Sequence, residues 1–265
     1  MAEPPAEQAP RPRRGDVANA PRTAAVWDVV QRLAADLAGA DNRPLRVLDV
    51  GGGTGGLAVP LAALGHRVTV VDPSPDALAS LGRRAAESGV QHLVDAVQAD
   101  TGTLAAVVEP ASVDLVCCHG VLEYVDDPAT AIAAVGAVVR PGGLVSLLVA
   151  QRSAAVIARA LAGRFAEAAH ALDDPDGRWG PDDPLPRRYD ESSLVPLVSA
   201  AGLRVRQVHG VRVFTDLVPA GLVDGAAARG ALLDLERRAG SHRDHPGLAA
   251  LAAQLHVVAE RPVPA

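Results

Sequence analysis

Hydrophobic positions along the chain follow two alternating patterns: short apolar runs, and longer stretches with apolar residues at helical spacing. Short runs bounded by Gly, Pro or charge are typical of buried strands. In the first 150 residues they predict strands over Leu45–Val50, Arg67–Val71, Asp95–Gln98, Val113–Cys118 and Leu144–Val149. Helical spacing predicts helices over Thr23–Leu37, Gly56–Leu64, Pro75–Ser88 and Pro128–Val139. Strands alternating with helices in this way indicate a parallel sheet with helices on both faces.

The segment 151–190 interrupts this alternation. A helical run, Ala154–Leu172, precedes a loop dense in Asp, Pro and Arg, and such insertions beyond strand ends commonly cover a substrate. The alternation then resumes with a helix, a strand, a helix and a last strand, over Glu191–Ala201, Leu203–Phe214, Gly225–Ala239 and Leu255–Ala259. The predicted fold is a Rossmann-like, mostly parallel sheet of seven strands in one domain, 22–265, with the last strand antiparallel.

The segment 1–21 is rich in Pro, Ala and charge, which predicts a disordered tail rather than a secretory signal. No apolar run approaches the roughly 20 residues of a membrane span, so no membrane association is expected. Cys117 and Cys118 are strand neighbours that point to opposite faces, and no Cys/His pattern around them indicates a metal. We therefore expect two buried thiols, a reducing cytoplasm and no metal.

A glycine-rich loop, Asp49–Gly55, follows the first strand. Glycine lets a ligand approach the backbone closely and tolerates positive φ. Asp72 ends the second strand, where it is placed to accept both hydroxyls of an adenosine ribose. The loop alone is ambiguous, because Gly51, Gly53 and Gly56 also spell a dinucleotide fingerprint with Asp72 about 20 residues on.

Three further features favour S-adenosylmethionine over a dinucleotide. Asp49 stands two residues before the first glycine, where a carboxylate can anchor the loop. Asp100 ends the third strand, in position to read the exocyclic amine of adenine. The turn Pro141-Gly142-Gly143 is habitual in methyltransferases. The alternative is an NAD(P)-dependent oxidoreductase. A third interpretation of the loop is a glycine turn that binds no ligand.

Several stretches resemble one known family: His119–Tyr124 with Asp127-Pro128 after it, Leu45–Gly53, Arg140–Gly143, Gly210–Phe214, Leu232–Glu236 and His256–Ala259. The family is the bacterial tRNA 5-carboxymethoxyuridine methyltransferases. They methylate the carboxyl group of a modified wobble uridine with S-adenosylmethionine. The resemblance runs from Arg22 to the C-terminus, and it implies a class I methyltransferase fold and a tRNA acceptor.

The resemblance also implies roles for individual residues. Arg22 would clasp the methionine carboxylate, and Gly52 and Gly53 would line the methionine and the ribose. Asp72 would hold the ribose hydroxyls, Asp100 and Thr101 would border the adenine, and His119 would touch the methionine end. A carboxylate acceptor is ionised at pH 7 and needs no general base, so no catalytic dyad is predicted. A hydroxyl or amine acceptor would need one, and His119 is the nearest candidate.

The charged residues do not decide whether the methyl acceptor is tRNA or a small carboxylate. The net charge is −6, and all 25 basic residues are arginine, which argues against a broad electrostatic grip on nucleic acid. A local rim of arginines would suit phosphate or carboxylate. The residues predicted to bind the acceptor are Tyr124, Arg152, Arg187, Arg188 and Arg212, with Arg159 and Arg164 completing the rim. No obligate protein partner is predicted.

Overall fold

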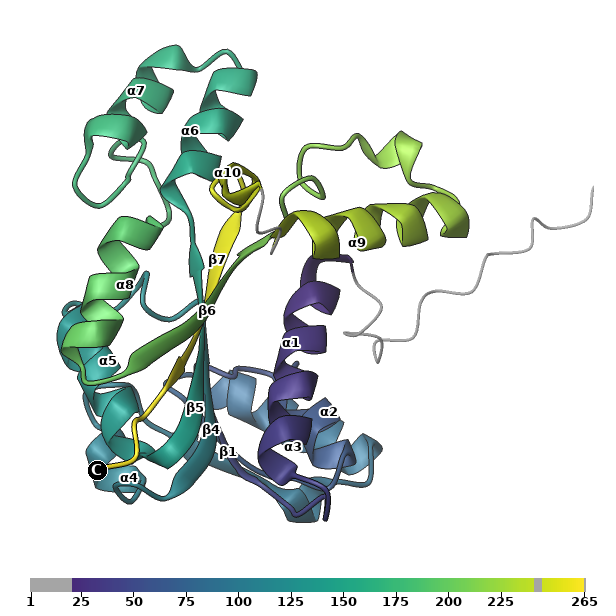
Figure 1. Ribbon diagram of the computed structural model, residues 1–265, viewed down its shortest axis with the longest axis vertical. Helices are drawn as coiled ribbons and strands as arrows, with labels where there is room; N and C mark the ends of the chain where they lie inside the picture. The colour runs from purple at the N-terminus through teal and green to yellow at the C-terminus, as the bar shows by residue number, and fades with distance from the viewer. Residues whose placement is uncertain (1–20, 241–244, 265) are drawn as a thin grey trace, which may run out of the picture.

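The computed structural model describes residues 21–240 and 245–264, so the predicted tail lies outside the described residues except for Pro21, which begins the first helix. Within the described residues the centre of the molecule is a seven-stranded sheet in the order β3-β2-β1-β4-β5-β7-β6 (Figure 1). The strands are β1 Arg46–Val50, β2 Arg67–Asp72, β3 Val94–Gln98, β4 Val113–His119, β5 Val139–Ala150, β6 Arg204–Val211 and β7 Gln254–Glu260.

The pairing of the strands confirms the predicted fold class. β3, β2, β1, β4 and β5 pair in parallel. β7 lies between β5 and β6 and is antiparallel to both, as predicted for the last strand. The order reverses beside β1, between β2 and β4, and ligands bind outside the carboxyl ends of parallel strands at such a point.

Helices cover both faces of the sheet. α1 Pro21–Ala38, α2 Ala58–Ala63 and α3 Pro75–Glu87 bury their apolar sides in one core. α4 Leu104–Val107, α5 Pro128–Val138 and α8 Glu191–Ala200 pack in a second core on the other face. Cys117 belongs to the first core and Cys118 to the second, and both thiols are free and buried, as expected for strand neighbours.

The insertion after β5 differs from its prediction. The single helical run expected over Ala154–Leu172 is two helices, α6 Arg152–Leu161 and α7 Phe165–Asp173. They separate at Gly163, whose φ of 72° is a left-handed conformation that ends a helix. The two helices pack together and project beyond the strand ends (Figure 1).

Other differences concern short elements. The predicted turn at Arg140–Gly143 lies inside β5, where Gly142 has a φ of 75° and the pairing register with β4 shifts. Four short helices had no predicted counterpart: α4, α10 Pro246–Ala249, and the 3₁₀ turns Gln91–Leu93 and Ala220–Leu222. The longer α9 Ala226–Gly240 was predicted and packs on α1 and β6. Among the described residues, no helix is long and apolar enough to span a membrane.

Candidate functional site

Two cavities meet at the glycine loop. The larger, of about 600 Å³, lies at the carboxyl ends of β1, β2 and β4; its lining includes Gly51, Asp72, Asp100, Thr101, Gly120, Val121 and Tyr124. The second, of about 330 Å³, is lined by residues that include Trp27, Asp49, Gly51, Gly52, His119, Arg212 and Gln254. Gly51 lines both, so the loop separates two halves of one site. Cavities of this size suit a small-molecule ligand.

The loop backbone requires glycine at specific positions. Gly51 and Gly53 have φ of 69° and 54°, a region that side-chain-bearing residues rarely adopt. Gly52 is needed for another reason: a Cβ there would lie 2.5 Å from Asp49 Cγ and closer still to Oδ2. The backbone therefore passes directly over the Asp49 carboxylate, and its upper side stays open to a ligand.

The packing of the loop does not follow the dinucleotide fingerprint. In that fingerprint the third glycine allows close packing of helix and strand. A Cβ at Gly56 would meet nothing within 4 Å, whereas one at Gly55 would overlap Leu81 Cδ1. Gly56, the third glycine of the dinucleotide spacing, is thus not required by packing here, and this argues against the alternative of a nicotinamide enzyme.

Asp72 fastens the loop to the end of β2. Its Oδ2 accepts a hydrogen bond from Gly53 N at 2.9 Å, and its Oδ1 accepts one from Ser74 N at 2.9 Å. The residue is 8% exposed and lines the larger cavity. Each carboxylate oxygen can accept a second hydrogen bond, so the side chain still has acceptors for a pair of ligand hydroxyls.

Asp49 is a buried carboxylate below the loop. Burial, reinforced by the charge of Asp72, raises the pKa of Asp49 to about 7. Its Oδ2 has no hydrogen-bond partner among the described residues. A loop anchored by hydrogen bonds to Asp49 was expected, and that oxygen supplies no such anchor. Since the residue lines the second cavity, its carboxylate, with one unpartnered oxygen, lies beneath the place where a cationic ligand would fit.

The two residues expected at adenine differ in how available they are. Thr101 is buried and lines the larger cavity. Asp100 also lines it, but its Oδ1 accepts hydrogen bonds from Thr103 N at 2.9 Å and Thr103 Oγ1 at 2.8 Å. These bonds lower the pKa of Asp100 and tie the carboxylate to the turn before α4. A hydrogen bond from adenine to Asp100 Oδ1 would therefore compete with the hydrogen bonds that Thr103 donates to the same oxygen.

His119 ends β4 and is held by a chain of hydrogen bonds across the sheet. Its Nε2 lies 2.8 Å from Ser146 Oγ, which lies 2.7 Å from His256 Nε2. Ser146 and His256 are fully buried. Burial lowers the pKa of His119 to about 4, so the ring that lines the second cavity is neutral at pH 7.

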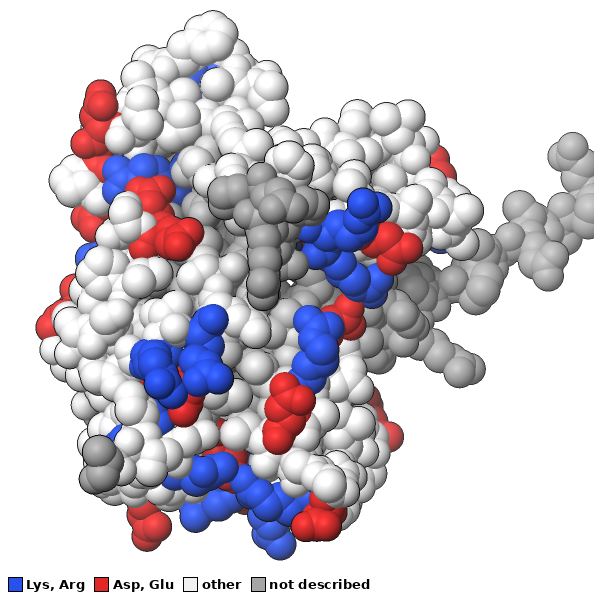
Figure 2. Space-filling model, in the orientation of Figure 1, with Lys and Arg blue, Asp and Glu red and all other residues white. Residues whose placement is uncertain are grey.

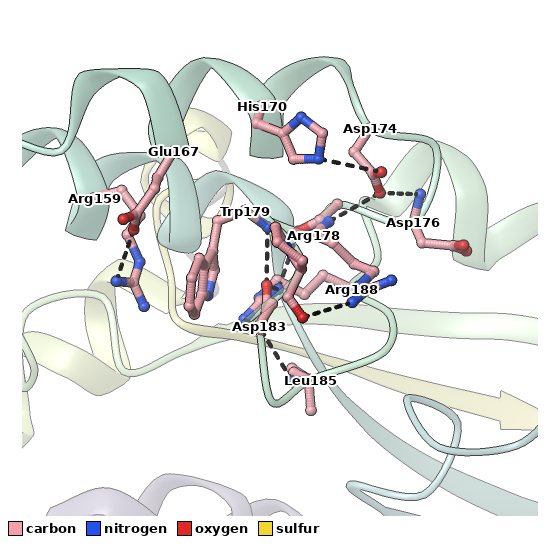
Figure 3. A network of polar contacts seen from close by, with 12 residues as sticks. Arg159, Glu167, His170, Asp174, Asp176, Arg178, Trp179, Asp183, Leu185 and Arg188 are labelled. Atoms are coloured by element: carbon pink, nitrogen blue, oxygen red, sulfur yellow. Dashed lines mark hydrogen bonds and ion pairs between the residues drawn. The ribbon is translucent and has the colours of Figure 1, made fainter.

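The arginines that were predicted to form a basic rim on the insertion are each paired with a carboxylate. Arg152, Arg187 and Arg188 form ion pairs with Asp190, Asp176 and Asp183. The Arg188 pair is bidentate, at 2.6 and 3.0 Å, and Asp183 also accepts hydrogen bonds from Trp179 N and Leu185 N (Figure 3). Arg159 and Arg164 both pair with Glu167. Within the acidic loop, Asp176 and Asp183 therefore each lie next to a guanidinium that balances their charge.

The remaining predicted residues have different positions. Arg212 lines the second cavity. Tyr124 is 62% exposed at the edge of the larger one, which leaves it accessible to an acceptor. Arg22 lies in α1, but its side chain lies outside the described residues, so its predicted contact with a methionine carboxylate is untested. On the face seen in Figure 2, arginines generally lie beside acidic residues and form no extended basic surface.

Several structural residues had not been predicted. Glu236 of α9 is buried and accepts hydrogen bonds from the backbone N–H groups of 213–215. Gln151 donates to three carbonyl oxygens, those of Ala249, Ala250 and Ala252, and joins the insertion to the segment before β7. Glu123 accepts a hydrogen bond from Ala150 N at 2.7 Å. The only sequence signal for Glu123 and Glu236 was their place in stretches that resemble the family.

The two cavities match the parts of a sulfonium nucleoside. The larger one has the Asp72 carboxylate for a ribose, and the smaller one has Asp49, with its unpartnered Oδ2, for positive charge. A Cβ at Gly52 would fill the backbone cradle between them. No group of three or more potential metal ligands occurs among the described residues. Fold and site together define an S-adenosylmethionine-dependent methyltransferase.

Comparison with known proteins gives the family. A family model described as a methyltransferase domain matches residues 19–208, and the chain belongs to that family. The tRNA 5-carboxymethoxyuridine methyltransferase of Escherichia coli (strain K12) is 30% identical, over 91% of this chain and 88% of that protein. The ubiquinone biosynthesis O-methyltransferase of Methylocella silvestris is 40% identical, over 45% of each chain. An S-adenosylmethionine-dependent methyltransferase structure from Mesorhizobium loti aligns with a TM-score of 0.59 and 20% identity, over 92% of this chain and 100% of that one.

Proposed function

We propose that this methyltransferase esterifies a carboxylate, that of 5-carboxymethoxyuridine at the wobble position of tRNA. The observation that carries the proposal is Arg212, which lines the same cavity as Gly52 and His119. A guanidinium pairs well with a carboxylate. The similarity to the Escherichia coli tRNA enzyme adds support because it spans 91% of the chain, whereas the similarity to the Methylocella silvestris enzyme spans 45%.

The cofactor residues follow from the two cavities. Asp72 receives the ribose hydroxyls in the larger cavity, and Thr101 borders the adenine. Asp49 attracts the positive charge of the methionine end from below the loop, while Gly52 keeps the backbone close. The paired helices of the insertion 151–190 lie beyond the strand ends and cover the acceptor.

The proposed methyl transfer depends more on how the acceptor and the methyl donor are positioned than on acid or base catalysis. S-adenosylmethionine, when bound, supplies a methyl group on a leaving group that is already activated. The protein residues must hold the acceptor oxygen in line with that methyl group. Arg212 holds an acceptor that is already ionised at pH 7. His119 has a pKa of about 4 and is a weak base, which suits a carboxylate better than a hydroxyl or an amine.

The test is transfer of a labelled methyl group to tRNA that carries the carboxylated wobble uridine. We expect label in that tRNA, and mild alkali should release it as methanol, because a methyl ester hydrolyses where ring and ribose methyl groups do not. Matched tRNA that lacks the carboxymethoxy group is the control and should stay unlabelled. Alkali-stable label, or equal label in both tRNAs, would contradict the proposal.

A small carboxylate is the second candidate acceptor. It is favoured by the ion pairs of the insertion, in which the rim arginines Arg152, Arg159, Arg164, Arg187 and Arg188 already have carboxylate partners. Label transfer to small carboxylic acids, with none to tRNA, would identify this class.

The affinity for cofactor should depend on pH through Asp49. Its pKa is raised to about 7, so the carboxyl group is largely neutral below that pH and ionised above it. We expect affinity for the cationic S-adenosylmethionine to rise as pH increases from 6 to 8, by up to about tenfold. S-adenosylhomocysteine lacks the sulfonium charge and should show a smaller rise.

Calorimetry at several pH values measures this dependence, and Asp49→Asn is the control. The variant keeps the size of the side chain and has no ionisable group, so its affinity should not change over the same range. An equal pH dependence in the wild-type protein and the variant would exclude Asp49 as its source.

A further inference from the structure

Arg212 has a backbone conformation that few residues with a side chain adopt. Its φ is 64°, in the left-handed region. Glycine would take this conformation at no steric cost, and an arginine retained there is a sign of function rather than of stability. The side chain is 25% exposed and lines the cavity next to the glycine loop.

A buried carboxylate stabilises the backbone immediately after Arg212. Glu236 of α9 accepts hydrogen bonds from Val213 N at 2.7 Å, Phe214 N at 2.8 Å and Thr215 N at 2.6 Å. Its Oε1 also accepts one from Thr215 Oγ1 at 2.6 Å. Such charge-assisted hydrogen bonds are stronger than neutral ones, so a single side chain fixes the turn.

Close packing fixes the other side of the same turn. A Cβ at Gly210 would lie 2.6 Å from Ala249 Cα, and one at Gly240 would overlap the Gly210 carbonyl oxygen. The Arg212 carbonyl accepts a hydrogen bond from Ala253 N at 3.0 Å. β6, α9 and the segment before β7 therefore all constrain the backbone of Arg212.

Asp216 orients the Arg212 guanidinium, and one of its nitrogens has no close partner among the described residues. Asp216 pairs with Nε and Nη2. Among the described residues, Nη1 has only a long contact of 3.5 Å, to Gln254 Oε1, and Gln254 lines the same cavity. Nη1 is thus available to an anionic oxygen in the cavity, while Asp216 holds the plane of the group.

The geometry points to Glu236 as a positioning residue, which places the Arg212 guanidinium to bind the acceptor carboxylate and to discriminate it from its methyl ester. The inference rests on the proposed carboxylate chemistry. Methylation converts the anion into a neutral ester, and the ester loses its ion pair with Arg212. Arg212 should therefore bind substrate more tightly than product and promote product release.

Two variants test this role through steady-state kinetics with the carboxylated tRNA. Arg212→Gly removes the guanidinium and also relieves the backbone conformation. We expect the acceptor KM to rise by about tenfold or more, with little change in kcat, in cofactor affinity or in the temperature of unfolding. Glu236→Gln should raise the acceptor KM by about tenfold too, because an amide nitrogen faces the backbone N–H groups that the carboxylate accepted.

Two further substitutions are controls. Ala111→Gly relieves another residue with positive φ, 53°, which lies in the turn before β4, and it should leave the acceptor KM unchanged. Thr215→Val removes one of the four hydrogen bonds to Glu236 and should give a smaller rise in the acceptor KM. This variant replaces Glu236→Gln as the test if Glu236→Gln does not fold. The ratio of affinities for carboxylated tRNA and its methyl ester should fall in Arg212→Gly and Glu236→Gln, fall less in Thr215→Val, and stay unchanged in Ala111→Gly.

Unchanged KM and unchanged ester discrimination in both test variants would overturn the inference while the proposed function stands. A parallel fall in unfolding temperature, cofactor affinity and kcat would show a merely structural role and would overturn it as well. If wild-type protein transfers no methyl group to carboxylated tRNA, the proposed function fails. The inference is then decided by calorimetry of 5-carboxymethoxyuridine with S-adenosylhomocysteine present: weaker binding by Arg212→Gly supports it, and equal or absent binding overturns it.

Discussion

Replacing Gly52 with alanine should weaken cofactor binding by about tenfold to a hundredfold, the range expected for one carbon forced into a fully packed place. The added Cβ would lie 2.5 Å from Asp49 Cγ and 3.0 Å from Val70 Cγ1. Neither neighbour can move easily, because Asp49 and Val70 are paired residues of β1 and β2. The loop must rise instead, and it then enters the space that a ligand needs.

Gly82→Ala is the matched control. Gly82 lies in α3 and lines neither cavity, and a Cβ there would meet nothing within 4 Å. Its cofactor affinity should stay within about twofold of wild type, since substitutions away from packed features have small effects. Calorimetry with S-adenosylhomocysteine measures both variants. Equal affinities would show that the cradle over Asp49 is not part of the binding site.

The same loop shows why part of the site could be predicted from sequence. Its glycines, Asp49 and Asp72 all lie at the ends of adjacent parallel strands, and the order of elements along the chain already places these ends together. The seven strands were predicted on the same grounds, because apolar runs of this length leave few alternatives. Local pattern therefore predicted the sheet, and it predicted that the glycine loop, Asp49 and Asp72 share the edge of the sheet where we propose that the cofactor binds.

The acceptor half could not be predicted in the same way. Whether an arginine meets solvent or a carboxylate depends on the folded path of the insertion, and Arg188 with Asp183 shows that a basic rim and an acidic loop can neutralise each other. Ser146 and His256 are 110 residues apart in sequence and meet only because β5 pairs with β7. Polar partners across strands leave no local signal.

Asp72→Ala should reduce affinity for S-adenosylmethionine by about 1.5–3 kcal/mol, or roughly tenfold to 150-fold, the usual contribution of hydrogen bonds to a charged group. Two effects combine in this loss. A ligand loses the acceptors for its ribose hydroxyls, and Gly53 N and Ser74 N lose the oxygens that fasten the loop to β2. Asp76→Ala is the control, because Asp76 is an exposed acid in the first turn of α3 with no place in either cavity.

The choice of ligand separates the roles of the two carboxylates. S-adenosylmethionine and S-adenosylhomocysteine share the ribose, so Asp72→Ala should weaken both to the same extent in calorimetric titrations. They differ in the sulfonium charge, so Asp49→Asn should weaken S-adenosylmethionine more than S-adenosylhomocysteine. If Asp72→Ala instead discriminated between the two ligands, the ribose would not lie at Asp72, and the assignment of adenosine to the larger cavity would be wrong. If affinity stayed unchanged in the folded variant, the site itself would lie elsewhere on the sheet.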